Sequence, residues 1–273
     1  MLTAAHKRRL ITAAALLGVL LLCIAFGGWM LRLLALVASS LALHEFFRLF
    51  YPEGTQNGRK LFGLVLGGLV ILFQAGGPLW SAVALALCFA ALCIAFLCDY
   101  GNGNPDARLA DSAPLALGIL YVPFLIQLAL YLGPAEQCLV ILAAVASDTG
   151  GYYVGSRFGR RKLWPSVSPN KSWEGLWGGM ALCVLVTALL GSLCVGQGWS
   201  VPPLPLWGWI VTGLLLNLAA VAGDLFESAV KRSQDVKDSG SLLPGHGGML
   251  DRIDSLLFVL PVYCLIRLVC GLS

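Results

Sequence analysis

Acidic, basic and hydroxyl side chains occur at helical spacing in the segment from Gly223 to Arg232. Asp224, Glu227, Ser228 and Lys231 stand at positions i, i+3, i+4 and i+7, which places them on one face of a helix. Asp224 ends a long apolar run, where a carboxylate is costly unless it is paired or binds a cation. The alternative is a helix end whose charges are simply solvated. We favour a functional role, because acids in such positions commonly serve ion or substrate binding.

A second polar segment, residues 237–254, combines a glycine-rich turn with two further acids. Its centre, Pro244 to Gly248, cannot form regular helix, and the exposed amides of such a turn can bind phosphate oxygens. Asp251 and Asp254 follow at i, i+3, so that both carboxylates can face one direction and bind Mg²⁺ that carries a nucleotide phosphate. The alternative is a flexible loop before a charged helix start. The flanking Lys-Asp and Asp-Arg-x-Asp sequences favour phosphate chemistry.

His246 lies inside that turn, and three roles are open to it: phosphate contact, proton transfer or ordering of the loop. Attack by a phosphate oxygen needs no general base, because the phosphate is already ionised at neutral pH. We therefore favour phosphate contact or loop ordering for this histidine.

Asp148 lies within Ser147 to Gly151, where an apolar stretch precedes it and a partner is required. Gly151, Gly155 and Gly159 follow at four-residue spacing. We interpret this spacing as close helix packing and not as a dinucleotide loop, because no strand–helix unit surrounds it.

A basic cluster, Arg157 and Arg160 to Lys162, precedes the polar segment from Ser168 to Gly175. The cluster can attract a nucleotide or an anionic lipid head group, or it can simply mark the cytoplasmic side of a membrane. In the polar segment the hydroxyl groups and Lys171 are candidates for holding phosphates.

These segments are embedded in a chain that is 58% hydrophobic and only 12% charged. Soluble domains contain about 25% charged residues, so a soluble fold is excluded. Apolar runs of about 20 residues cross a bilayer as helices. We predict an all-α polytopic membrane protein with about nine spans, at residues 10–27, 29–47, 61–77, 79–98, 113–132, 136–153, 173–196, 206–225 and 254–271.

The charges predict an orientation for these spans. With the N-terminus in the cytoplasm, all 18 Lys and Arg residues except Arg32 and Arg267 fall in cytoplasmic segments. The nine cysteines form no CxxC pair, and we interpret them as small apolar residues of the spans. We expect one integral-membrane domain over residues 1–273 in the cell inner membrane, with N-terminal spans 10–132, a catalytic part 136–271 and the active site at the cytoplasmic helix ends.

The polar segments resemble those of the phosphatidate cytidylyltransferase (CDP-diacylglycerol synthase) family. The resemblance comprises Ser147-Asp148-Thr149-Gly150, then Ser168 to Gly175, and then Ser228 through Asp254. Asn170 and Ser172 depart from the family, which more often has Lys and Thr there. The resemblance implies transfer of CMP from CTP to phosphatidic acid, with pyrophosphate as the second product. It also implies Mg²⁺, a paired-cation centre at Asp224 and Asp251, and a homodimer.

The residues and the resemblance together give one set of site expectations. The expected metal ligands are Asp224, Asp251, Glu227, Asp148 and Asp254. The expected substrate contacts are Ser168, Asn170, Lys171, Ser172, Ser228, Lys237, Gly247, Gly248 and Arg252. Lys171, Lys231, Arg232 and Arg252 would offset the charge of two polyanionic substrates, beside His246. CTP, phosphatidic acid and membrane lipids are the expected partners, and no nucleic acid is expected.

Two other functions remain open from the sequence. A CTP-dependent lipid kinase would transfer the γ-phosphoryl group to an alcohol, and its products would be a phospholipid and CDP. A secondary transporter could use Asp148 and Asp224 to bind coupling ions. The sequence shows no pair of broken helices in two matching halves, which secondary transporters often have. The polar residues also gather at one membrane face and not at the midplane, which argues against a transporter.

Overall fold

The computed structural model describes residues 16–51, 54, 56–102, 108–240 and 247–271. In these ranges seven helices are long and apolar enough to cross a membrane, which agrees with a polytopic membrane protein. They span Gly28–Phe50, Asn57–Gly76, Pro78–Gly101, Leu109–Tyr131, Pro134–Phe158, Trp173–Gly196 and Leu206–Ser233.

The first and last of the nine predicted spans correspond to helices that are not among these seven. The first overlaps a shorter apolar helix, Leu16–Phe26. The last corresponds to α10 (Leu250–Val269), which carries Asp251, Arg252 and Asp254 in its first turns and Pro261 in its interior. The count of nine spans and the orientation therefore stay predictions.

The segment 113–132 departs from the single helix that its apolar run predicts. It consists of α5 (Ala113–Tyr121), α6 (Pro123–Ile126) and η3 (Gln127–Tyr131), and η2 (Leu109–Ser112) precedes it. The break lies at Pro123, which has no N–H to donate to the preceding turn.

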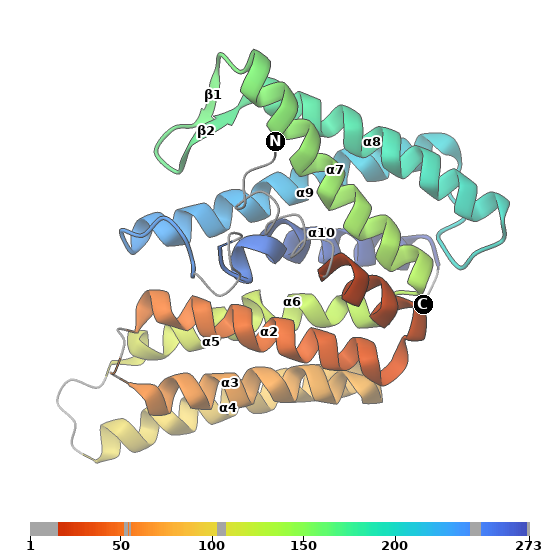
Figure 1. Cartoon of the computed structure of the whole chain (residues 1–273). Helices are drawn as coiled ribbons and strands as arrows, with labels where there is room; N and C mark the ends of the chain where they lie inside the picture. The colour runs from red at the N-terminus through yellow and green to blue at the C-terminus, as the bar shows by residue number, and fades with distance from the viewer. Residues whose placement is uncertain (1–15, 52–53, 55, 103–107, 241–246, 272–273) are drawn as a thin grey trace. The chain divides into compact units, whose positions relative to one another are not determined.

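By compactness the chain divides into two units, and the first comprises residues 1–130 together with 238–250. Besides the helix Leu16–Phe26 it contains α2 (Gly28–Phe50), α3 (Asn57–Phe73), α4 (Pro78–Gly101), α5 and α6 (Figure 1), with η1 (Gln74–Gly76) between α3 and α4. Phe46 and Phe47 of α2 are fully buried in its core. Gly63 and Gly118 lie against the Phe47 ring, where a Cβ would come within 2.5 Å and 2.6 Å of it, so these glycines permit the close packing.

The second unit comprises residues 131–237 and 251–273. It contains α7 (Pro134–Phe158), the strands β1 (Lys162–Trp164) and β2 (Ser168–Ser172), α8 (Trp173–Gly196), α9 (Leu206–Ser233) and most of α10 (Figure 1). The strands pair antiparallel, with Lys162 opposite Ser172. This hairpin departs from the all-α expectation, because short strands between polar turns carry no apolar alternation that would reveal them. The division into N-terminal spans 10–132 and a catalytic part 136–271 stays a prediction.

Glycines join α7 to α8, as their four-residue spacing predicts. A Cβ on Gly155 would stand 3.4 Å from Gly175 Cα, and one on Gly159 would stand 2.7 Å from Ser172 Oγ. At Gly150 the two backbones come close, since a Cβ there would lie 2.5 Å from Gly178 O. The packing interpretation is therefore confirmed.

We expect Gly150→Ala to lower the stability of the protein by about 1–3 kcal/mol, because the added methyl group would overlap the α8 backbone, which cannot rotate away. Thermal unfolding in detergent micelles measures the effect. Gly151→Ala is the matched control, since a Cβ there would lie 3.6 Å from Gly175 O, an ordinary contact distance. Equal midpoints for the two variants would contradict this account of the α7–α8 interface.

Candidate active site

The polar face predicted on α9 is present. Ser228 Oγ donates a hydrogen bond to Asp224 Oδ1 over 3.3 Å, and Lys231 Nζ forms an ion pair with Glu227 Oε2 over 2.5 Å. Both contacts join residues four positions apart on the helix. Lys231 and Arg232 lie in the last turn of α9, where their positive charge is favourable to the helix dipole.

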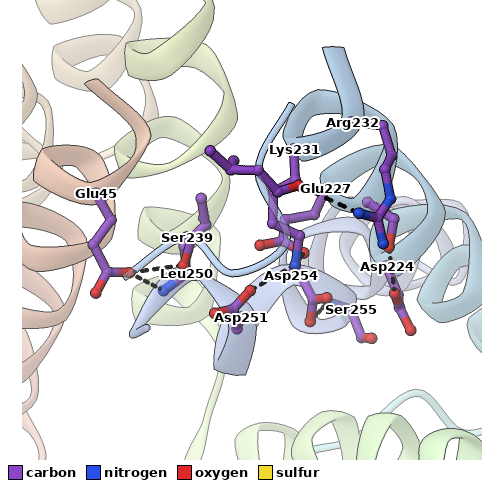
Figure 2. Close-up of polar contacts among 12 residues, drawn as sticks. Glu45, Asp224, Glu227, Lys231, Arg232, Ser239, Leu250, Asp251, Asp254 and Ser255 are labelled. Atoms are coloured by element: carbon purple, nitrogen blue, oxygen red, sulfur yellow. Dashed lines mark hydrogen bonds and ion pairs between the residues drawn. The ribbon is translucent and has the colours of Figure 1, made fainter. Parts of the chain in front are cut away.

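Lys231 connects this face to the first turn of α10. Its Nζ also donates to Asp251 Oδ1 over 2.6 Å, so that one ammonium group lies between two carboxylates (Figure 2). The side chains of Glu227, Lys231 and Asp251 are 2%, 12% and 16% exposed. Charges this deeply buried are stable only when they are paired, and the arrangement therefore fixes the positions of all three groups.

A second group of acids consists of Asp224 and Asp254, one helical turn away on α9 and α10, and Asp148 on α7. Lys171 Nζ forms an ion pair with Asp224 Oδ2 over 2.6 Å. Asp254, on α10, is 9% exposed, and its carboxylate is close enough to those of Asp224 and Asp148 for mutual repulsion. Ser255 Oγ donates a hydrogen bond to Asp148 Oδ1 over 3.3 Å. Lys171 attracts this group of three acids and reduces their repulsion.

Gly223 explains how α10 comes close enough to α9 for these contacts. A Cβ at this position would stand 2.5 Å from the backbone oxygen of Asp254. The absence of a side chain therefore lets the two helices approach beside Asp224, the next residue along α9.

The hairpin holds Lys171 in place from the other side. Glu174, at the start of α8, accepts hydrogen bonds from the backbone N–H groups of Arg160 and Arg161 at 3.0 Å and 3.2 Å. Ser172 caps α8, since its Oγ accepts a hydrogen bond from Gly175 N over 3.1 Å. The residue before this cap is Lys171, so the cap and the hairpin together fix the backbone that carries the lysine.

The other residues expected to contact substrate differ in how far their side chains are buried. Ser172 is 3% exposed and its hydroxyl is used in the cap, whereas Ser168 is half-buried and Asn170 is exposed. Three basic side chains are exposed, namely Arg232, Lys237 and Arg252, and Arg232 donates to Val236 O over 3.5 Å. Gly247 and Gly248 belong to the first unit. His246 lies outside the described residues.

Within the described ranges, no group of three or more His, Cys, Asp or Glu residues is arranged as a metal site. In this structure Lys171 and Lys231 hold oxygens of Asp224, Glu227 and Asp251. The expected ligands are thus brought together as two lysine-bound groups, and the paired-cation centre stays a prediction.

Three polar features of the structure are not predicted from the sequence. Ser147 Oγ and Asn217 Oδ1 meet over 2.7 Å between α7 and α9, Ser255 contacts Asp148, and Glu45 is fully buried in the first unit. Nothing in the spacing of Asn217 or Ser255 identifies their partners. Glu45 does carry a signal in the sequence, since it is an acid near the end of an apolar run and such an acid needs a partner.

Comparison with known proteins identifies the family to which this chain belongs. A model of the cytidylyltransferase family matches residues 7–270. A phosphatidate cytidylyltransferase of Staphylococcus aureus (strain COL) is 35% identical over 269 residues, which cover 94% of this chain and 96% of the relative. One of Staphylococcus epidermidis (strain ATCC 35984) is 32% identical over 265 residues, with the same two coverages. One of Bacillus subtilis (strain 168) is 45% identical over 132 residues, which cover 48% of this chain and 46% of the relative. The chain belongs to the cytidylyltransferase family.

Proposed function

We propose that this membrane enzyme transfers CMP from CTP to phosphatidic acid and releases pyrophosphate. The observation that carries the proposal is the buried pairing of Lys231 with Glu227 and Asp251, beside Lys171 and Asp224. Relatives that are named phosphatidate cytidylyltransferase match nearly the whole chain and support the choice of substrates.

The reaction joins two polyanions, and the arrangement of charges suits that task. An oxygen of the phosphatidic acid phosphate attacks the α-phosphorus of CTP, and the bond from that phosphorus to the pyrophosphate oxygen breaks. The attacking oxygen is already ionised, so no side chain has to remove a proton. Lys171 and Lys231 are held rigidly by carboxylates, and such fixed cations stabilise the charge that develops on both phosphates.

The carboxylates also fit the Mg²⁺ that the family resemblance implies. Carboxylate oxygens are the hard ligands that this ion prefers, and Glu227 Oε1 is buried with no hydrogen-bond partner in the described part of the chain. Asp224, Glu227 and Asp251 would hold the ion or ions, with Asp148 and Asp254 beside them. When bound, Mg²⁺ would neutralise the triphosphate and polarise the α-phosphorus.

The charges and the relatives support a location for the reaction. Positively charged loops favour the cytoplasmic face, and the matching proteins are bacterial. We therefore place the site at the cytoplasmic face of the cell inner membrane, where CTP arrives from solution and phosphatidic acid from the lipid leaflet. A homodimer is suggested by the resemblance alone.

The test is transfer of label from CTP to lipid. Purified protein is incubated with phosphatidic acid, Mg²⁺ and CTP that is labelled at the α-phosphate, and the lipid is then extracted. We expect label in the lipid phase and its loss with EDTA. Label that enters lipid only from the γ-phosphate, with an alcohol lipid as acceptor, would identify a kinase instead. No turnover of nucleotide with any lipid would contradict both enzymes and favour a transporter.

Lys171→Ala should lower the rate of CMP transfer by about 10- to 100-fold without abolishing it, because Lys231 still supplies positive charge at the neighbouring carboxylates. Steady-state kinetics with varied CTP measure the change. Arg108→Ala, which removes an exposed cation outside the polar segments, is the control and should stay within about twofold of the wild type. A Lys171→Ala variant with full activity would remove this residue from the site.

A further inference from the structure

One buried carboxylate accepts hydrogen bonds from both ends of the segment 239–250. Glu45 of α2 is 0% exposed. Its Oε2 accepts hydrogen bonds from Ser239 Oγ over 3.2 Å and from Leu250 N over 2.8 Å (Figure 2). Its Oε1 accepts one from Met249 N over 3.0 Å. Both ends of the segment therefore form hydrogen bonds with the same side chain.

Two glycines of this segment show how closely the backbone approaches the carboxylate. A Cβ on Gly240 would lie 2.7 Å from Glu45 Oε1, and a Cβ on Gly248 would overlap Ser239 Oγ and the Glu45 carboxylate. Neither glycine has a positive φ, so both are required for space and not for backbone conformation. Close packing against Glu45 is thus a second reason for a glycine at position 248, beside the phosphate site that the sequence indicated.

The chemistry of the contacts calls for a carboxylate. Glu45 uses both oxygens to accept from backbone N–H groups, and one of them also accepts from a hydroxyl. A glutamine has the same size but only one acceptor oxygen, and its NH₂ group would face a backbone N–H. Hydrogen bonds to an ionised acceptor are also roughly twice as strong as neutral ones.

We propose that Glu45 is a positioning residue for CMP transfer, which holds Gly248 to Leu250 in one conformation and thereby fixes the backbone from which Asp251 follows. The inference rests on the proposed function, because it explains how a residue outside the expected catalytic part acts on the reaction. In this role Glu45 needs no contact with either substrate. Its effect on the reaction is exerted through the backbone that it binds.

The experiment compares the Glu45→Gln variant with the full-length wild type in two measurements. We expect its kcat/KM for CTP to fall by about 10- to 100-fold, as is typical when the support of a site residue is removed. We also expect faster hydrogen–deuterium exchange in peptides that cover residues 239–250, because the amides of Met249 and Leu250 lose their acceptor. Glu45→Asp, which keeps both oxygens on a shorter side chain, should recover part of the activity.

Glu136→Gln is the matched control. Glu136 is a buried carboxylate, 1% exposed, which likewise accepts from a backbone N–H, that of Gly133 over 2.9 Å, and also pairs with Arg267. It lies at the start of α7, away from the expected site residues. Per folded molecule, its transfer activity and the exchange of residues 239–250 should stay within about twofold of the wild type.

A second variant keeps the inference falsifiable if Glu45→Gln does not fold. Gly240→Ala should produce the same two effects by displacing the carboxylate, and the defect should be smaller when Glu45→Asp makes room for the new methyl group. Gly58→Ala, where a Cβ would meet nothing within 4 Å, is its control.

The outcomes separate the inference from the function on which it depends. An inactive wild type would overturn the proposed function itself. An active wild type with unchanged kinetics and exchange in Glu45→Gln or in Gly240→Ala would overturn the positioning role. A loss of activity that only follows the folded fraction, with unchanged exchange, would also overturn it.

Discussion

Asp251→Asn is expected to lower the rate of CMP transfer by at least about 100-fold, the scale on which a fixed electrostatic group contributes to catalysis. The substitution keeps the size of the side chain but removes the charge that holds Lys231 Nζ at 2.6 Å and that the proposed Mg²⁺ would bind. Asp224→Asn should have a similar effect, because Asp224 holds Lys171 at the same distance. The measurement is the rate of lipid labelling from α-labelled CTP at saturating substrate.

Asp99→Asn provides the control for this charge removal. Asp99 also forms an ion pair, with Arg59 over 2.8 Å, but its side chain is 46% exposed and lies on α4 in the first unit. An exposed pair contributes at most about 1 kcal/mol, so this variant should insert and work like the wild type. Near-normal activity in either Asp224→Asn or Asp251→Asn, with normal insertion, would contradict the assignment of the site.

Lys231→Met should affect stability as well as activity. It leaves the carboxylates of Glu227 and Asp251 facing one another in a buried position with no cation between them. Removing one member of a buried ion pair costs about 3–5 kcal/mol, because the remaining charge has lost both water and partner. Thermal unfolding in detergent micelles should therefore show a clearly lower midpoint, and lipid labelling should fall with it.

A double variant separates these two effects. Lys231→Met combined with Glu227→Gln removes one of the unpaired charges and should regain part of the lost stability, but not the activity. Arg59→Met, which breaks the more exposed pair with Asp99, should lower the stability by about 1 kcal/mol or less. If Lys231→Met unfolds at the wild-type midpoint, the buried charge network does not stabilise the protein in the way that the geometry indicates.

The sequence predicted those features that depend on spacing within one helix. Asp224, Glu227, Ser228 and Lys231 share a face because α9 is a regular helix, and their mutual contacts follow from that periodicity. The apolar runs predicted most of the long helices for the same reason, and the four-residue glycine pattern predicted the close approach of α7 and α8.

Contacts between distant segments could not be predicted in this way. No spacing rule pairs Lys231 with Asp251, Ser147 with Asn217, or Glu45 with the backbone some 200 residues later. Ser172 shows a further limit, because a serine before a helix can bind a ligand or cap the helix, and its environment decides which. The short hairpin before it was missed because so few residues give no periodic signal.

The central claim is that the carboxylates of α9 and α10 support transfer of CMP to phosphatidic acid. The most direct measurement runs α-labelled and γ-labelled CTP in parallel, with wild type and Asp251→Asn, and counts labelled lipid and labelled pyrophosphate. The account predicts equal amounts of both products from the wild type and neither from the variant. Labelled pyrophosphate without labelled lipid, or equal yields from Asp251→Asn, would contradict it.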